Sequence, residues 1–459
     1  MKVNSQIFTR EKIRWLQTIL AERFGTLFSI SEHGETEEKI LCLALSGSEV
    51  YIVFDCLQSS FQESRSDFPC NLWNAEREGF TSVLESELPA PGVAKLPSPL
   101  IEKINSGYCV HYDILGLTYW MLTRMEEIGR RDLDDHGRFP AKSSHAFQHD
   151  YLERPIVDEW LHILGQVIQC VWPQIHLKRH QFDIKVSHDV DAPARYAFQK
   201  LGGLIRTMGG DVIVRKDLGS ALAGPWIWLN SKKEIHPRDP VNTFDWLMEQ
   251  SELHGFTSAF YFICGRTDKT KDAAYDPEMP QVRALMRKIY LRGHEIGLHP
   301  SYNTFDNPEE IRREADRLRK VCREESIDQS AWGGRMHFLR WDQSVTLKAW
   351  NDAGMAYDST LGYADLPGFR CGTCFEYPAF DITSDQMLPL RIRPLVAMDC
   401  TIIAERYLGL GSTEAAFNKF NELKNKCKAV GGVFTLLWHN SFFSSAEDFS
   451  IYSRLLKDN

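Results

Sequence analysis

Two acidic residues that lie close together give the first sign of chemistry in this sequence, in residues 187–191 (SHDVD). The segment continues an apolar-alternating run, 182–187, which predicts a β-strand. Side chains alternate along a strand, so Asp189 and Asp191 are expected on one side, where their charges repel. A metal ion beside one carboxylate would remove that penalty and leave the other free to act as a base. A loop in which one aspartate caps a helix would also explain the pair.

Three further segments place an imidazole or a guanidinium where a predicted strand ends. Residues 293–299 (GHEIGLH) end in His299, residues 333–335 (GGR) end in Arg335, and residues 432–439 end in His439. Imidazole is a common metal ligand, and arginine can hold a carboxylate through two parallel hydrogen bonds. These three residues and the acidic pair lie where separate predicted elements end. Together they indicate a metal-dependent acid–base site.

The elements that must position these residues alternate along the chain after about residue 181. Helices are predicted at 241–254, 280–292, 308–325, 342–353 and 413–429, and strands at 182–187, 258–263, 295–298 and 432–438. This alternation predicts an α/β fold with a parallel sheet or barrel, in which chemistry gathers at the strand ends. Residues 1–180 mix short strands and helices, so we expect a mixed α/β domain of unknown role at 1–180 and a catalytic domain at 181–459.

Taken in this order, the segments resemble the polysaccharide deacetylase (NodB-homology) family of carbohydrate esterases, over about residues 181–445. The extra N-terminal domain is typical of a divergent branch. The resemblance implies a distorted (β/α)7 barrel. It also implies metal-dependent hydrolysis of an N-acyl group, N-acetyl in the first place, on a sugar of a surface polysaccharide or its precursor.

The same resemblance implies roles for five residues. Asp189 would be the catalytic base, held by Arg335, and His439 the general acid. Asp191 and His299 would bind the metal, which is expected to be zinc, with cobalt, nickel or manganese as alternatives.

The family's second metal-binding histidine corresponds to Asn303 in this chain. An amide carbonyl is a weaker and harder ligand than imidazole, so a site that includes Asn303 could hold zinc loosely or prefer another divalent ion. His337 is expected either to replace the lost ligand or to contact substrate. Three residues are expected to bind substrate: Arg370, His337 and Trp438.

Three classes of function remain open at this stage. The first is the deacetylase, and the second keeps the fold but hydrolyses another C–N bond, such as a formamide. The third is a degenerate domain that binds glycan or serves as an assembly subunit, which Asn303 favours. Retention of both Asp189 and His439 argues for turnover, because a pure binder needs neither an acid nor a base.

Composition limits the partners. The 459 residues carry a net charge of −9 without a long basic stripe, which argues against nucleic acid. Eleven cysteines without a disulfide framework fit a reducing compartment. Neither a signal peptide nor an apolar run of about 20 residues is found, so we expect a cytoplasmic protein without a transmembrane segment. A carbohydrate substrate is expected, with association with polysaccharide-synthesis proteins as a further possibility.

A long insertion, residues 196–238, separates the acidic pair from the next predicted helix. Its Trp226 and Trp228 could stack on a sugar ring, although packing against the N-terminal domain is the favoured interpretation. Residues 204–214 could alternatively form an amphipathic helix at a membrane surface.

Overall fold

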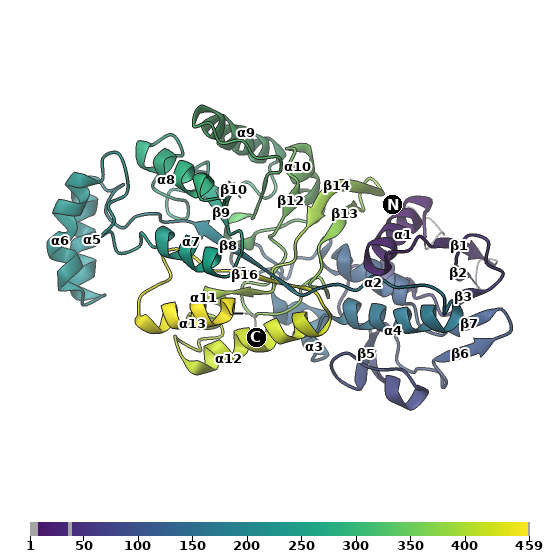
Figure 1. Ribbon diagram of the computed structural model, residues 1–459. Coiled ribbons are helices and arrows are strands. Elements are labelled where there is room, and N and C mark those ends of the chain that lie inside the picture. The colour runs from purple at the N-terminus through teal and green to yellow at the C-terminus, as the bar shows by residue number, and fades with distance from the viewer. Residues whose placement is uncertain (1–7, 35–38, 458–459) are drawn as a thin grey trace.

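The computed structural model describes residues 8–34 and 39–457 as a mixed α/β protein with two main sheets (Figure 1). The first sheet has five strands in the order β1-β2-β3-β7-β6, and a separate hairpin pairs β4 with β5. Their bounds are β1 (Ser29–His33), β2 (Ile40–Ala44), β3 (Tyr51–Phe54), β4 (Cys70–Asn74), β5 (Glu87–Pro91), β6 (Ile101–Ile104) and β7 (Gly107–Val110).

The second sheet has nine strands in the order β13-β14-β12-β11-β10-β9-β8-β16-β15, and only β13 runs antiparallel to its neighbour. The bounds are β8 (Asp183–Val190), β9 (Ala259–Ile263), β10 (Glu295–His299), β11 (Gly333–Gly334), β12 (Tyr357–Asp358), β13 (Tyr377–Asp381), β14 (Gln386–Ile392), β15 (Ala397–Met398) and β16 (Val433–Leu437). The sequence therefore predicted the parallel α/β arrangement correctly.

The two ends of the parallel sheet meet through one stretch of chain. β14 pairs with β12, and the same chain runs on through Leu395, whose N–H donates to Leu361 O at 3.1 Å. The next residue, Val396, donates to Thr435 O at 3.2 Å, and β15 then pairs with β16. The sheet thus curves until residues 386–398 contact both of its ends.

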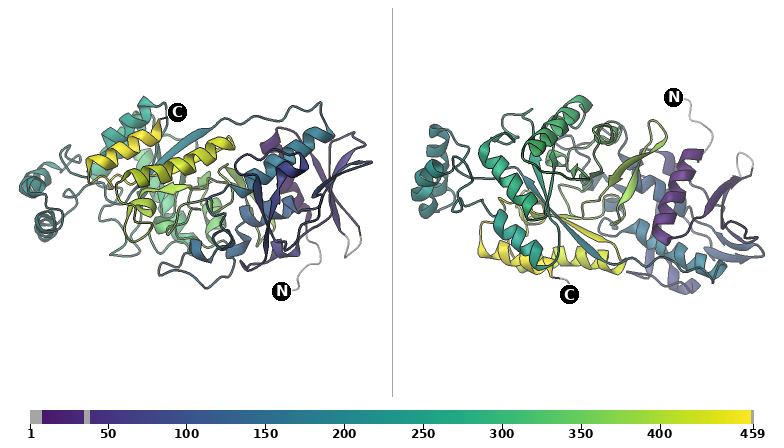
Figure 2. Two further views of the ribbon diagram at one scale, coloured as in Figure 1. Left: turned by 90° about the horizontal axis from the view of Figure 1, so that it is seen from below. Right: turned by 45° about the horizontal axis from the view of Figure 1, so that its top comes forward.

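Helices cover the outside of this curved sheet and lie beside the first sheet, except the two within residues 201–230, which stand apart from both sheets (Figure 1, Figure 2). They are α1 (Arg10–Phe24), α2 (Ile114–Leu122), α3 (His145–Gln148), α4 (Ile156–Val171), α5 (Leu201–Ile213), α6 (Leu218–Asn230), α7 (Phe244–Leu253), α8 (Pro280–Leu291), α9 (Pro308–Glu324), α10 (Thr346–Asp352), α11 (Asp399–Ile403), α12 (Glu414–Ala429) and α13 (Ala446–Leu456). In α9 the buried residues recur at helical spacing, for example Ile311, Ala315 and Leu318. Within the described ranges, no helix has both the length and the apolarity that crossing a bilayer requires.

One hydrophobic core runs through both halves of the chain. Trp15 on α1 is fully buried and donates its indole N–H to Pro378 O on β13 at 2.8 Å. Val157 N–H on α4 donates to Gly372 O at 2.8 Å. Residues before 180 therefore pack directly against the second sheet.

A buried ionic cluster joins the same two regions and corrects one expectation. Arg370 is buried and donates its Nε–H to Glu127 at 2.9 Å and its Nη1–H to Gly362 O at 2.9 Å. Arg124 donates to the same carboxylate at 2.8 Å. The structure therefore gives Arg370 a place within the protein interior and not at a substrate surface.

We predict that Glu127→Ala destabilises the protein by about 3–5 kcal/mol, because it leaves buried guanidinium groups without their counter-charge. The free energy of unfolding in urea measures the effect. Glu63→Ala is the matched control: the Arg65–Glu63 pair is about half exposed, at 48% and 47%, so its loss should leave the free energy of unfolding almost unchanged. Equal losses in the two variants would refute the structural role of the cluster.

Candidate metal centre and active site

The side chains that could bind a metal or transfer protons lie at the carboxyl ends of the parallel strands. Asp189 is the last residue but one of β8, Asp191 lies just beyond the strand, and His299 is the last residue of β10. Arg335 follows β11, and His439 lies two residues after β16. Because neighbouring parallel strands end at the same edge of the sheet, residues that are far apart in sequence meet there.

Three imidazoles approach the carboxylate of Asp191, which keeps 35% of its side chain exposed. The Nε2 atoms of His299 and His337 lie 3.3 and 3.5 Å from Asp191 Oδ1. His439 Nε2 lies 3.8 Å from the other oxygen, Oδ2. Metal-ligating atoms of Asp191, His299 and His337 all lie within 4.8 Å of one another.

The opposite nitrogen of each ligand-like imidazole is held by a group that only accepts hydrogen bonds. His299 Nδ1 lies 2.6 Å from Arg335 O, and His337 Nδ1 lies 3.1 Å from Asp272 Oδ1. Both Nδ1 atoms must therefore carry the proton, which leaves each neutral ring with a free Nε2 lone pair. A carboxylate or carbonyl behind the ring is the usual support of a metal-binding histidine.

Two buried atoms in the cluster, His299 Nε2 and Asp191 Oδ1, face each other at 3.3 Å without a well-formed hydrogen bond, and neither bonds to another described residue. Buried polar atoms without a partner cost free energy, and a divalent cation between them would satisfy both. The donor set of one carboxylate and two imidazoles also suits zinc and its first-row neighbours. The residues therefore fit a metal.

Asp272 fixes His337 from a loop after β9. Its carboxylate also accepts hydrogen bonds from the N–H groups of Thr267 and Tyr302, at 2.8 and 2.7 Å. Burial opposes the charged form of Asp272, but the hydrogen bond from His337 and those from backbone N–H groups lower its pKa. No pattern in the sequence indicated Asp272, because this residue lies in an irregular loop.

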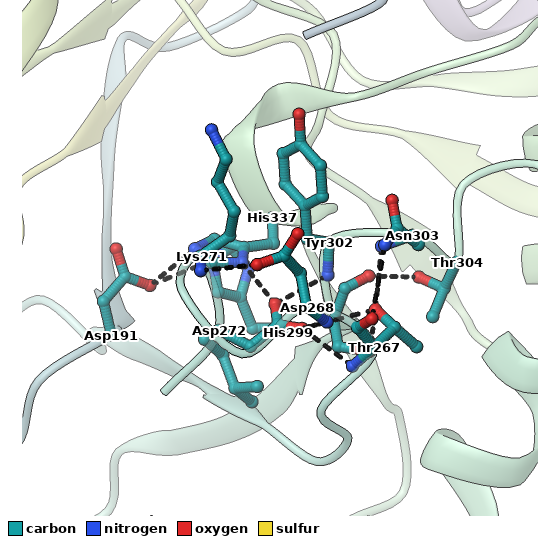
Figure 3. A network of polar contacts seen from close by, with 12 residues as sticks. Asp191, Thr267, Asp268, Lys271, Asp272, His299, Tyr302, Asn303, Thr304 and His337 are labelled. Carbon is teal, nitrogen blue, oxygen red and sulfur yellow. Dashed lines mark hydrogen bonds and ion pairs between the residues drawn. The ribbon is translucent and has the colours of Figure 1, made fainter. Parts of the chain in front are cut away.

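Asn303 does not reach the cluster, contrary to the expectation from sequence. Its side-chain N–H₂ donates to Thr267 O at 3.3 Å, and its Oδ1 accepts from Arg340 at 3.2 Å. Figure 3 shows Asn303 and Asp191 on opposite sides of the polar network, with His299 and His337 between them. The amide is thus engaged in holding a loop, and His337 occupies the place beside Asp191.

Asp189 is held by a fully buried arginine. Arg335 donates from Nη1 to Asp189 Oδ1 at 2.8 Å, and from Nη2 to Ser187 and Ser359 hydroxyls at 2.9 and 3.0 Å. Its Nε–H donates to Ser359 O at 2.8 Å. Gly334 permits this placement, since a Cβ there would lie 1.9 Å from Leu298 O. Asp189 Oδ2 remains free to face the cluster.

His439 is oriented by Asp399, a residue that the sequence analysis missed. Asp399 Oδ1 lies 2.8 Å from His439 Nδ1, and its Oδ2 accepts the backbone N–H of His439 at 2.7 Å. Burial disfavours the charged imidazole, but the carboxylates of Asp399, Asp191 and Asp189 together raise the pKa of His439 to about 10. The position of Asp399, directly after a short apolar run, was the available signal.

Trp438, expected to bind substrate, is fully buried instead. Its indole N–H donates to Phe442 O at 3.1 Å, and its ring packs against Phe420 and Phe443. This side chain therefore supports the end of β16 from within the core.

The cluster opens into a small cavity of about 80 Å³. Besides the cluster itself, Phe338, Leu339, Arg406, Tyr407 and Arg138 line it. Phe338 and Leu339 both adopt left-handed backbone conformations, with φ of 62° and 56°, which costs about 1–3 kcal/mol per residue. Arg138, from the N-terminal half of the chain, donates to Phe338 O at 2.9 Å and stabilises this strained turn.

Comparisons with known proteins are distant. Residues 1–173 match the model of a family of unknown function (DUF7033). No curated protein matches the chain.

Solved structures show weak similarity. A protein classed as a polysaccharide deacetylase from Mycobacterium smegmatis is 16% identical, with 61% of this chain and 84% of that chain covered and a TM-score of 0.39. The allantoinase PuuE is 13% identical over 71% and 89% of the two chains, with a TM-score of 0.36. A second protein classed as a polysaccharide deacetylase, from Pseudomonas aeruginosa PAO1, is 13% identical over 60% and 84%, with a TM-score of 0.35. Such scores carry no argument about this chain, so its function is argued from the site itself.

We predict that His337→Ala abolishes stoichiometric binding of zinc, whereas Asn303→Ala retains it, because His337 Nε2 lies beside Asp191 and the Asn303 amide does not. Metal content of the purified proteins by mass spectrometry gives the answer. His111→Ala serves as a control, since Asp55, Cys56 and His111 form a separate group that could hold an ion. Loss of metal in Asn303→Ala with retention in His337→Ala would reverse the assignment.

Proposed function

We propose that this protein is a metal-dependent hydrolase that removes an N-acyl group, N-acetyl in the first place, from a sugar of a surface polysaccharide or its precursor. The observation that carries the proposal is the convergence of His299, His337 and His439 on Asp191, beside an Asp189 held by a buried arginine. This arrangement would supply a metal site, a base and an acid within one small cavity.

A distorted (β/α)7 barrel of the polysaccharide deacetylase type is the fold we propose for residues 181–459. The contact of residues 386–398 with both β12 and β16 supports closure of the sheet into a ring. With β14 and β15 counted as one position and β13 left outside, the ring has seven strand positions. Residues 1–180 would form a second domain that buttresses the site, as the hydrogen bond from Arg138 to Phe338 suggests.

Asp191, His299 and His337 would hold the metal, with zinc expected first and cobalt, nickel or manganese as alternatives. When bound there, the ion would supply Lewis-acid chemistry toward an amide carbonyl and toward water. The cavity of about 80 Å³ has room for the acyl end of a substrate. The sugar itself would then lie at the cavity mouth, near Phe338 and Arg406.

Asp189 is placed to accept the proton of the attacking water. Arg335 occupies only its Oδ1, so Oδ2 is available and lies 3.7 Å from His299 Nε2. His439 is placed to give a proton to the departing amine, because Asp399 fixes its Nδ1 and directs Nε2 toward Asp191. General acid–base catalysis of this kind contributes about 10²–10⁴-fold.

The same residues would serve hydrolysis of another C–N bond, such as a formamide. A glycan-binding or assembly role without turnover is less well supported, because His337 stands where the lost ligand would be needed. Full metal content without hydrolysis of any N-acyl sugar would favour that alternative.

We predict that Asp189→Asn and His439→Ala each lower kcat/KM for release of acetate or formate by about 10²–10⁴-fold, because each removes one proton-transfer group. Assays would use a panel of N-acetyl and N-formyl sugars with metal content measured in parallel. Asp183→Asn makes the same chemical change at the opposite end of β8, where the side chain is half exposed, and should leave kcat/KM unchanged. Undiminished activity in either active-site variant would exclude the assigned role.

A further inference from the structure

A pair of helices, α5 and α6, stands out from the body of the protein on the side opposite the five-stranded sheet (Figure 1, Figure 2). The pair lies in the insertion that begins just after Asp191. Asp239 anchors its base by accepting the N–H groups of Arg195 and Tyr196 at 2.8 and 3.0 Å. The expected packing of this insertion against the N-terminal half is therefore not found.

The helix pair has a small core of its own, separate from the main one. Tyr196, Leu204 and Ile227 form this core, with Met208, Ala223 and Trp228 partly buried against it. Trp228 also donates its indole N–H to Gln199 O at 2.8 Å. The helices thus pack on each other, and their outer faces contact no other part of the described chain closely enough to be buried.

These outer faces are unusually apolar. Of the fifteen large hydrophobic residues that are exposed in the described part of the chain, nine lie between residues 201 and 229, with exposed fractions from 44% to 83%. They are Leu201, Ile205, Val212, Ile213, Val214, Leu218, Leu222, Trp226 and Leu229. An apolar surface concentrated in one place marks an interaction site.

The spacing of these residues gives each helix an apolar stripe. Leu201, Ile205 and Val212 follow one another at intervals of four and seven residues on α5. Leu218, Leu222 and Leu229 repeat the same intervals on α6, which contains no charged residue. Intervals of four and seven keep side chains on one face of a helix. Each helix therefore presents a continuous apolar face to its surroundings.

The charge around the hairpin is opposite to that of the whole protein. Residues 200–238 contain seven basic and three acidic residues, a net charge of +4, whereas the chain carries −9. All seven basic residues are exposed: Lys200, Arg206, Arg215, Lys216, Lys232, Lys233 and Arg238. Of the acidic residues, Asp211 is buried and bonded to Tyr196. The hairpin thus offers apolar and basic groups side by side.

We propose that the α5–α6 hairpin docks the protein onto the surface of an anionic lipid bilayer. Apolar stripes would enter the boundary between headgroups and acyl chains, while the exposed lysines and arginines contact acidic headgroups. Each helix has 13 residues and is about 20 Å long, shorter than the hydrocarbon layer of about 30 Å, so the hairpin would lie in the interface.

Charge decides between this occupant and a second copy of the chain. Two hairpins meeting face to face would bring like charges together, whereas an acidic membrane attracts them. The inference stands without the proposed hydrolase activity. If both hold, the site would work next to the bilayer, on a sugar carried by lipid.

Flotation with phosphatidylcholine vesicles, with and without phosphatidylglycerol, tests the proposal on the full chain. Wild type should float with the anionic vesicles. The triple change Leu218→Ser, Leu222→Ser and Leu229→Ser should reduce binding at least about tenfold, because it removes the apolar stripe of α6. Lys232→Gln with Lys233→Gln should weaken binding to anionic vesicles by about fivefold for each lysine.

Leu253→Ser with Leu291→Ser is the matched control, since both leucines are 74% exposed but lie outside the hairpin. Binding in this control should equal that of wild type, and urea unfolding would show that all variants are folded. Absence of wild-type flotation with anionic vesicles would overturn the proposal. A lipid-independent dimer that the triple change dissociates would also overturn it and assign the surface to a second copy.

Discussion

The buried charge of Arg335 is the constraint on which the rest of the site depends. A guanidinium taken out of water must be paired and hydrogen-bonded, or it costs several kcal/mol. Here Asp189 supplies the counter-charge, and Ser187 and Ser359 accept the remaining hydrogen bonds. These partners come from β8 and from the turn after β12, so one side chain fixes the relative position of three strands. It also leaves one oxygen of Asp189 free for chemistry.

The three imidazoles of the site are likewise held in place by hydrogen bonds from behind. Each of the three is fixed through Nδ1, by the carbonyl of Arg335, the carboxylate of Asp272 or the carboxylate of Asp399. The Nε2 atoms then have no freedom to turn away from Asp191. A cluster of this kind is preorganised, because hydrogen bonds to the supporting groups fix the orientation of each ring before a ligand binds. As a result, Asp191 Oδ1 and His299 Nε2 face the cluster without forming a hydrogen bond.

Residues of the N-terminal half also support the site through direct contacts. Arg138 holds the strained turn at Phe338, next to His337, and Glu127 neutralises Arg370 in the interior. Strain of this sort persists only where surrounding contacts over-determine the backbone. The first half of the chain therefore shapes the cavity wall, whereas the α5–α6 hairpin, on the other side of the curved sheet, faces outward.

Local pattern alone determined much of this protein. Apolar periodicity located β8, β9, β10 and β16 and the helices α7, α8, α9, α10 and α12, and it placed Asp189, Asp191, His299, Arg335 and His439 at or next to strand ends. Those assignments succeed because periodicity and strand termination are short-range properties. The exchange of Asn303 for His337, the supports Asp272 and Asp399, and the interior positions of Arg370 and Trp438 were decided by tertiary structure. Each depends on which groups meet although they are far apart in the sequence. A buried hydrogen bond or ion pair between such groups produces no periodic pattern that could be recognised in the sequence.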